Sequence, residues 1–299
     1  MKRLRSMLGV LVAALIALSA CASSGDSAAT GIPAKGPVKV LYAGSLVNLM
    51  EHHLGPQFEK ASGDTFEGFS AGSSALAMQI AGKVRQGDVF ISASPSVNAD
   101  LQGPAKGNWV SWYVTFASAP LVIGYNLNST FAADLKSKPW YQVITEPGFL
   151  LGSTDPKLDP KGKLANQALT EAAKDYHDPW LPAAVAKTIT VLPETELVGR
   201  LESRQLDAGF FYSSEASEQK LPTVGLGQVS LAASYTATVL NKAPDPGPAA
   251  AFVQYLVSPA GAALLRQDGL TVLPLTLHGD PATVPAPLTS ILPRTAAGP

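Results

Sequence analysis

The sequence predicts an α/β fold, and three observations support that prediction. Short apolar segments alternate with segments whose apolar residues recur every three or four positions, as in helices that pack on a sheet. Several of the short segments are continuously apolar, which is typical of parallel strands buried on both faces. With 299 residues, 46% of them apolar and 15% charged, the chain is too apolar for an intrinsically disordered protein and long enough for one large domain or two lobes.

The predicted strands and helices follow one another from residue 38 onward. The strands are expected at 38–42, 88–92, 120–125, 149–152, 188–192, 207–212, 235–240 and 271–273. The helices are expected around apolar residues at helical spacing, namely Val47, Met50, Leu54 and Phe58; Leu76, Ile80 and Val84; Leu164 and Ala168; Leu197 and Leu201; and Phe252 and Leu256. The proline-rich tail from His278 is expected to wrap around the surface.

The first 20 residues have the pattern of a secretory signal peptide. Three basic residues precede an apolar run of 12 residues at 7–18, which as a helix would rise only about 18 Å against the roughly 30 Å of a membrane's hydrocarbon core. Cys21, the only cysteine, follows directly after Leu-Ser-Ala and cannot form an internal disulfide. Leu-Ser-Ala-Cys resembles a bacterial lipobox, which implies cleavage before Cys21 and lipid attachment to its sulfur. A buried free cysteine is the alternative, and the polar surroundings of Cys21 disfavour it.

Charge and composition limit the kinds of molecule that the mature protein is expected to bind. The whole chain has a formal net charge of −1, and removal of residues 1–20 leaves 19 basic and 23 acidic residues. No basic surplus is available to neutralise phosphates, which argues against nucleic-acid binding. Residues 22–36 are mostly small and polar and suit a flexible tether with a reach of about 20 Å. We therefore expect a signal peptide at 1–20, a lipidated tether at 21–36, and an extracytoplasmic body anchored to the cell membrane.

Polar residues gather at four predicted junctions between a strand and the helix that follows it. The junctions are 42–45, 69–74, 155–162 and 193–197, and the first two supply serines and the last two supply acids. Ligands of open α/β sheets bind beyond the carboxyl ends of strands, where helix N-termini present free N–H groups. Taken one at a time, each residue is explained as a helix N-cap or a partner of the helix dipole. Together they favour a ligand site, although the pattern alone does not show that they converge.

At these junctions the sequence resembles the molybdate and tungstate substrate-binding proteins of ABC transporters, and it is more similar to their tungstate-type branch. The resemblance runs from about Val38 to Pro274 and rests on seven ordered segments, which are 42–46, 71–73, 88–94, 112–117, 155–160, 194–197 and 207–212. It implies a two-lobed periplasmic-binding-protein fold, type II-like, with a hinge between the lobes. Lobe 1 would comprise 37–118 and 233–299, and lobe 2 would comprise 119–232.

The resemblance also implies the function. The expected protein captures molybdate or tungstate in the cleft between its lobes and delivers it to an ABC permease. It would be a monomer without enzymatic activity or a cofactor. The family's oxyanion contacts fall on Gly44, Ser45 and Ser73 in lobe 1, and on Asp159, Pro160, Lys161, Glu194 and Tyr212 in lobe 2.

The two acids in this set have a specific role in the tungstate-type branch. The carboxylates that match Asp159 and Glu194 approach the metal itself and extend the tetrahedral oxyanion toward six-coordination. Molybdenum(VI) and tungsten(VI) are hard centres that accept oxygen ligands. Sulfate sulfur cannot expand in this way, so the same carboxylates would exclude sulfate by repulsion. Neutral donors and helix dipoles would hold the dianion, with no buried counter-cation.

The chain departs from the branch pattern at two places. After the Asp-Pro pair the branch tends to have Cys-Gly-Tyr, whereas this chain has Lys161-Gly162-Lys163. The branch also tends to carry a glutamate just before the tyrosine, where Phe211 stands here. We expect the two lysines to add long-range attraction for anions.

Two alternative functions remain compatible with the sequence. The same lobes could bind sulfate, phosphate or a metal ion, or the chain could be an extracytoplasmic hydrolase. The hydrolase interpretation lacks a His-Glu-x-x-His motif and a Cys/His cluster. Ser217 and Lys220 match Ser-x-x-Lys without its companion motifs, and the His52-His53 pair is expected on a solvated helix face. Asp159 and Glu194 could form a glycosidase pair, but no aromatic sugar platform accompanies them.

Overall fold

The computed structural model describes residues 36–295. The predicted signal peptide, the lipidation of Cys21 and all but the last residue of the predicted tether lie outside the described residues. Within 36–295 no single helix is long and apolar enough to cross a membrane. The helices Pro246–Leu256 and Pro259–Gln267 reach that length and composition only as a pair, with a bend of 62° between them.

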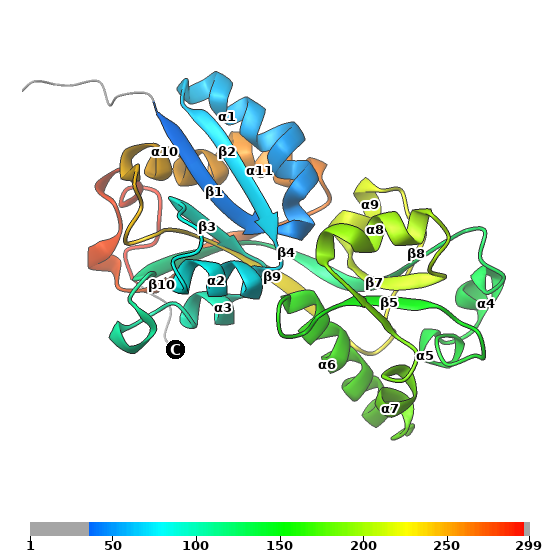
Figure 1. Cartoon of the computed structure of the whole chain (residues 1–299). Helices are drawn as coiled ribbons and strands as arrows, with labels where there is room; N and C mark the ends of the chain where they lie inside the picture. The colour runs from blue at the N-terminus through cyan, green and yellow to red at the C-terminus, as the bar shows by residue number, and fades with distance from the viewer. Residues whose placement is uncertain (1–35, 296–299) are drawn as a thin grey trace, which may run out of the picture. The chain divides into compact units, whose positions relative to one another are not determined.

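The predicted α/β fold is confirmed. The described strands are β1 (Pro37–Ala43), β2 (Thr65–Ala71), β3 (Val89–Ser92), β4 (Trp112–Tyr125), β5 (Leu151–Thr154), β6 (Thr190–Leu192), β7 (Ala208–Tyr212), β8 (Thr223–Val224), β9 (Ala232–Val239) and β10 (Thr271–Gly279). They form one sheet in the order β2-β1-β3-β9-β4-β7-β5-β6, with β10 and β8 also paired to β4 (Figure 1). β1 is parallel to β2 and β3, and β5 is parallel to β6 and β7, whereas β4 is antiparallel to all its neighbours.

Helices flank this sheet and connect its strands. The α-helices are α1 (Gly55–Ser62), α2 (Ser73–Ala81), α3 (Pro95–Ala99), α4 (Ala132–Ser137), α5 (Trp140–Val143), α6 (Pro160–Asp175), α7 (Leu181–Val185), α8 (Glu194–Glu202), α9 (Ser213–Glu218), α10 (Pro246–Leu256) and α11 (Pro259–Gln267). Short 3₁₀ helices are η1 (Gly44–Leu46), η3 (Pro104–Lys106), η4 (Pro281–Thr283) and η5 (Ala286–Leu288), and η2 (Leu49–Leu54) is a π-helix.

The first predicted helix passes through three helical types, η1, η2 and α1. The amide of Gly55 donates to the carbonyl of Met50, five residues back, which is the hydrogen bond of a π-helix. The next residue, Pro56, has no amide hydrogen and therefore cannot donate to a preceding turn. The proline explains why the wider helical turn sits directly before α1.

Strand β4 connects two parts of the sheet, which we call lobe 1 and lobe 2. Its residues 112–120 pair with β9 and β10, and its residues 121–125 pair with β7 and β8. Lobe 1 holds β1–β3, β10, α1–α3, α10 and α11, and lobe 2 holds β5–β8 and α4–α9 (Figure 1). The predicted two-lobed architecture is confirmed. The predicted lobe boundaries, 37–118 with 233–299 and 119–232, stay predictions.

Several strand predictions differ from the structure in extent. β4 begins at Trp112 rather than at 120, and β10 continues to Gly279 rather than ending at 273. β10 contains Pro274 within a register irregularity, where the missing amide hydrogen costs no ladder bond. β2 was not predicted, because this edge strand is half-exposed and has no continuous apolar run.

The core fixes the helices whose N-termini approach the cleft between the lobes. Leu197 and Leu201 of α8 pack with Leu206 and Phe211 in one apolar cluster, and all four side chains are buried. In lobe 1, Leu76 and Ile80 of α2 pack in a second cluster that includes Leu41 of β1 and Phe90 of β3. Because each helix is held by its apolar face, the polar residue at its start has a defined position.

Candidate functional site

The four predicted junctions supply the first residues of the helices at the cleft. In lobe 1, η1 begins directly after β1 and α2 begins after β2. In lobe 2, α6, α8 and α9 follow β5, β6 and β7, three strands whose parallel pairing puts their carboxyl ends at one edge of the sheet. The site residues on these starts are Ser45, Ser73, Pro160, Glu194 and Tyr212.

Two glycines let the backbone of lobe 1 approach the acids of lobe 2. A Cβ atom on Gly44 would lie 2.6 Å from Oε2 of Glu194. A Cβ atom on Gly72 would lie 2.5 Å from the carbonyl oxygen of Leu158 and 2.9 Å from Oδ2 of Asp159. Beside Gly72, the amide of Ala75 donates to the same Leu158 carbonyl at 2.9 Å. The two lobes therefore touch at this point through backbone, and neither glycine leaves room for a side chain.

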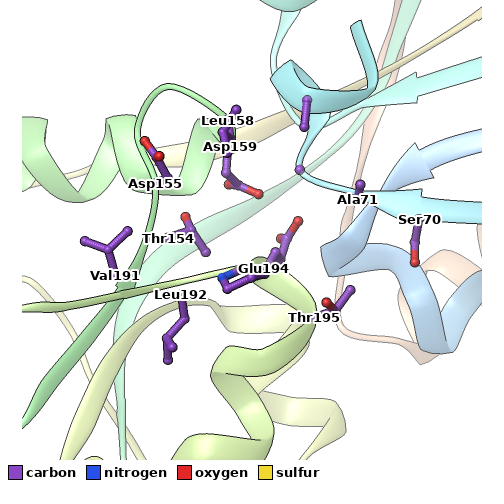
Figure 2. Close-up of a pocket in the computed structure, with 13 residues that line it drawn as sticks. Ser70, Ala71, Thr154, Asp155, Leu158, Asp159, Val191, Leu192, Glu194 and Thr195 are labelled. Carbon is purple, nitrogen blue, oxygen red and sulfur yellow. The ribbon is translucent and has the colours of Figure 1, made fainter. Parts of the chain in front are cut away.

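Asp159 and Glu194 each present one unpartnered oxygen in the cleft. Asp159 caps α6, because its Oδ1 accepts from the amide of Lys161 at 2.6 Å, whereas its Oδ2 has no hydrogen-bond partner. Glu194 Oε1 lies 3.3 Å from the Nζ of Lys161, and Glu194 Oε2 has no partner. Both carboxyl groups extend into the opening between β5, α8 and the start of α2 (Figure 2). Buried carboxylate oxygens without partners are costly, so this arrangement points to a ligand.

The hydroxyl groups of the site are also buried. Tyr212 is fully buried and its hydroxyl has no partner. Ser45 Oγ lies 3.0 Å from the hydroxyl of Tyr235, and Ser73 Oγ accepts from the amide of Ala93 at 3.1 Å. Because Ser73 accepts in that bond, its own hydrogen is free for another acceptor. Of the predicted contacts, Gly44, Ser45, Asp159 and Glu194 line openings between the lobes, whereas Ser73 and Tyr212 line neither opening.

Burial and mutual repulsion shift the ionisation of these groups. Burial and the neighbouring Asp159 carboxylate raise the pKa of Glu194 well above its usual value. Burial and nearby carboxylates likewise raise the pKa of Tyr212 and of Tyr235, so both phenols stay protonated donors at neutral pH. A ligand with a positively polarised centre would offset the repulsion between the two acids.

Lys161 overturns one expectation about the site. Its side chain is fully buried, and Nζ donates to Oε1 and Oε2 of Glu215 at 2.7 and 3.0 Å. The prediction of a site without a buried cation is therefore wrong, and Lys161 adds no long-range attraction from the surface. The reason is helical geometry, since Lys161 lies on the same buried face of α6 as Ala165, Ala168 and Ala172. Lys163 is exposed.

Glu215 and Tyr235 are site residues that the sequence reasoning missed. The carboxylate of Glu215 accepts from the amide of Tyr212 at 2.9 Å and so caps the start of α9. A signal for Glu215 was present, because a glutamate three residues after the end of a strand is typical of a capping box. Tyr235 lies on β9, far from the junctions in sequence, and no local pattern marks it.

Two openings reach the site among the described residues. One has a volume of about 310 Å³ and apolar walls that include Ala71, Leu158 and Leu192, with Asp159 and Glu194 at its base (Figure 2). The other has a volume of about 250 Å³ and is lined by Gly44, Ser45, Ser70, Glu194, Glu215 and Glu218. Glu194 forms part of the wall of both openings and is the central acid of the site.

The comparison with protein families gives this geometry a context. Residues 38–271 match the family of bacterial extracellular solute-binding proteins. The chain belongs to that family. The matched segment contains every predicted oxyanion contact from Gly44 to Tyr212.

Relatives whose names refer to molybdenum, molybdate or tungstate are similar to this chain. A candidate ABC transporter molybdenum-binding protein of Haloferax volcanii is 31% identical over 79% of this chain and 74% of its own length. The molybdate/tungstate-binding protein of Pyrococcus abyssi is 24% identical over 77% of this chain and 82% of its own length. The resemblance to molybdate and tungstate substrate-binding proteins is confirmed.

Solved structures share the fold. The periplasmic molybdate-binding protein of Azotobacter vinelandii superposes with a TM-score of 0.61 at 20% identity and covers 79% of this chain and 99% of its own. The sulfate-binding protein SubI of Mycobacterium tuberculosis superposes with a TM-score of 0.65 at 14% identity, over 86% and 92%. At these identities the likeness establishes the fold alone, so the choice of ligand must come from the residues of the site.

The residues singled out for other readings have ordinary contacts. His52 is exposed as expected, whereas His53 is half-buried and its Nδ1 lies 2.7 Å from Oδ1 of Asp268, a buried residue at the end of α11. Among residues 36–295, no three His, Cys, Asp or Glu side chains gather in a geometry that could hold a metal ion. The candidate site thus combines serine and tyrosine hydroxyls with buried carboxylates and the ammonium group of Lys161.

Proposed function

We propose that this solute-binding protein captures molybdate or tungstate between its lobes and delivers it to an ABC permease. The observation that carries the proposal is the set of three buried, unpartnered oxygen atoms, Oδ2 of Asp159, Oε2 of Glu194 and the hydroxyl of Tyr212. The relatives named for molybdate and tungstate support it. The protein acts by binding and release, without catalysis or a cofactor.

The donors of the site suit the oxygen atoms of an oxyanion. Ser45, Ser73 and Tyr212 supply hydroxyl groups, and Gly44 and Pro160 belong to helix starts. The amide of Lys161 is not free for the ligand, because it donates to Oδ1 of Asp159. Helix N-termini carry a partial positive charge that favours anions. These features serve any tetrahedral dianion and do not by themselves select one.

The carboxylates supply the selection. Asp159 as an anion would repel sulfate and phosphate oxygens. Molybdenum(VI) and tungsten(VI) can accept carboxylate oxygens as additional ligands, and this contact would release the proton that the raised pKa of Glu194 favours. The unpartnered oxygen of each acid is the one available for that contact. We therefore favour molybdate or tungstate over the other oxyanions.

Calorimetric titration of the purified protein with molybdate, tungstate, sulfate and phosphate tests the proposal. Molybdate and tungstate should bind stoichiometrically and without turnover. Sulfate and phosphate should bind at least about 100-fold more weakly, a difference of about 2.8 kcal/mol. Tighter binding of sulfate would contradict the ligand assignment.

We propose further that the monomeric protein works outside the cytoplasm, tethered through lipid on Cys21. The lipobox-like Leu-Ser-Ala-Cys segment and the short, polar residues up to 36 support this anchoring. Substitution of Cys21 by serine should abolish incorporation of a radiolabelled fatty acid and leave oxyanion affinity unchanged. Equal labelling of the Cys21→Ser variant and the parent would contradict the anchoring.

A further inference from the structure

The side chain of Lys161 contacts two buried carboxylates. Its ammonium group pairs with Glu215, at 2.7 Å, and also with Glu194, at 3.3 Å from Oε1. All three side chains are buried, with exposed fractions of 0% for Lys161, 8% for Glu215 and 3% for Glu194. One carboxylate would be enough to pair the charge, and the second belongs to the acid whose other oxygen is unpartnered in the cleft.

The three residues come from the first turns of three different helices. Lys161 is the second residue of α6, Glu194 is the first residue of α8, and Glu215 is the third residue of α9. The ammonium also lies 5.6 and 5.5 Å from the ring centres of Phe211 and Tyr212, within the range of cation–π attraction. These contacts hold the ammonium group of Lys161 in one position. They also link the first turns of α6, α8 and α9.

We infer that Lys161 is a positioning residue that sets the selectivity of the site. Its ammonium holds Oε1 of Glu194, so that Oε2 stays directed into the cleft, and Glu215 holds the ammonium in place. The inference rests on the proposed function for the identity of the ligand. A carboxylate held in one orientation can reach a metal centre and repel sulfate oxygens, whereas a carboxylate that rotates freely does both less well.

A purely structural role for Lys161 makes a different prediction. In that case Lys161 only neutralises the buried Glu215, and removal of both charges should leave oxyanion binding intact. The variant Lys161→Met alone does not separate the two roles, because it leaves two buried acids without a cation and is expected to destabilise the fold. The double variant Lys161→Met/Glu215→Gln removes one charge of each sign, so the net charge stays the same. Replacement of a whole buried ion pair is often neutral or stabilising.

The deciding experiment titrates tungstate and sulfate into the parent, the double variant and Lys174→Met. Lys174 is exposed in the last turn of the same helix, so its substitution should change neither affinity. In the double variant we expect tungstate affinity to fall about 10- to 100-fold and the tungstate-to-sulfate ratio to fall with it. A ratio that stays within about threefold of the parent would overturn the inference.

A second arm needs no ligand. The side-chain nitrogen of Lys161 can be followed by nitrogen-15 NMR and assigned by the loss of its signal in Lys161→Met/Glu215→Gln. The substitution Glu194→Gln should shift that signal, whereas Glu196→Gln, an exposed position two residues further along α8, should not. An unshifted signal in Glu194→Gln would overturn the inference. A parent that binds none of the oxyanions would instead overturn the proposed function, and this NMR arm then decides alone whether Lys161 holds Glu194.

Discussion

Asp159 and Glu194 line the cleft, and each has one carboxylate oxygen without a hydrogen-bond partner. In both, the other oxygen is committed, to the amide of Lys161 for Asp159 and to the ammonium of Lys161 for Glu194. Lys161 therefore organises both acids, one through its backbone and one through its side chain. This division leaves one carboxylate oxygen of each acid, like the hydroxyl of Tyr212, buried without a partner.

Removal of the carboxylates of Asp159 and Glu194 should lower the selectivity for tungstate over sulfate in two ways. In Asp159→Asn/Glu194→Gln, tungstate loses two anionic ligands and should bind at least about tenfold more weakly, while sulfate loses the repulsion that excludes it. The asparagine can still cap α6, so folding should weaken by about 1 kcal/mol or less. Calorimetric titration with both anions gives the ratio.

Ser45→Ala is the matched control for this double variant. It deletes a donor available to any tetrahedral oxyanion, so it should weaken tungstate and sulfate together and leave their ratio unchanged. If the double variant keeps the parent's tungstate-to-sulfate ratio, the acids act only as helix caps and the site is a general anion site.

Gly72 offers a steric test of the contact between the lobes. The backbone of Gly72 has φ −55° and ψ 133°, which alanine adopts easily, so any effect of Gly72→Ala comes from space alone. The added methyl would meet the Leu158 carbonyl and Asp159 and force the lobes apart. Titration should show weaker binding of all oxyanions, by about tenfold or more, with little change in their ratio.

Gly199→Ala is the control for this variant. Gly199 lies inside α8 with open space around it, and alanine there should raise the free energy of unfolding by about 0.5–1 kcal/mol without changing affinity. Unchanged binding in Gly72→Ala would show that the close approach of the lobes is not needed for the ligand.

At the scale of elements, the short helix α9 carries two acids with different surroundings. Glu215 is paired with Lys161, whereas Glu218 lines the smaller opening, where burial raises its pKa to about 7. That pKa already includes the lowering effects of a hydrogen bond with Gln219 and of His53, and the raising effects of the charges of Asp268 and Glu215. Glu218 is therefore a half-buried acid that loses its proton near neutral pH.

The stability of the protein should respond to this group between about pH 4.5 and 7. Because the folded state holds the proton of Glu218 more tightly than the unfolded state, its contribution is fully present at low pH and is lost as the pH rises through the folded pKa of about 7. Relative to the parent, Glu218→Gln should therefore gain stability as the pH rises. Urea unfolding of both proteins at pH 5 and pH 8 measures the difference, and an equal difference at the two values would contradict the expectation.

The sequence predicts those elements whose pattern is local and misses those that depend on distant partners. The apolar runs of β1, β3 and β7 are visible because both faces of these strands are buried. The edge strand β2 is half-exposed and carries no such run. In the site, Ser45, Ser73, Asp159 and Glu194 lie at recognisable helix starts, whereas the partnership of Lys161 with Glu215 joins residues 54 positions apart, which no local pattern reveals.

At the scale of the whole molecule, the two lobes meet through few polar contacts and an incompletely satisfied site. The oxygens of Asp159 and Glu194 without hydrogen-bond partners lie where Gly72 and Gly44 of lobe 1 approach these acids. A ligand that bonds to these oxygens and to the serines of lobe 1 would hold the lobes together. Such a ligand binds only the folded protein, and it should therefore stabilise that state by mass action.

At a ligand concentration 100 times the dissociation constant, this stabilisation is about 2.7 kcal/mol. For a chain of this length, it corresponds to a rise in melting temperature of roughly 4–5 °C. Molybdate and tungstate should each produce such a rise in thermal unfolding followed by circular dichroism. Sulfate at the same concentration should produce almost none, because repulsion by Asp159 and Glu194 keeps it far from saturation. A larger shift with sulfate than with tungstate would mean that the carboxylates do not reach a metal centre and that the fold shared with sulfate-binding proteins here serves the same ligand.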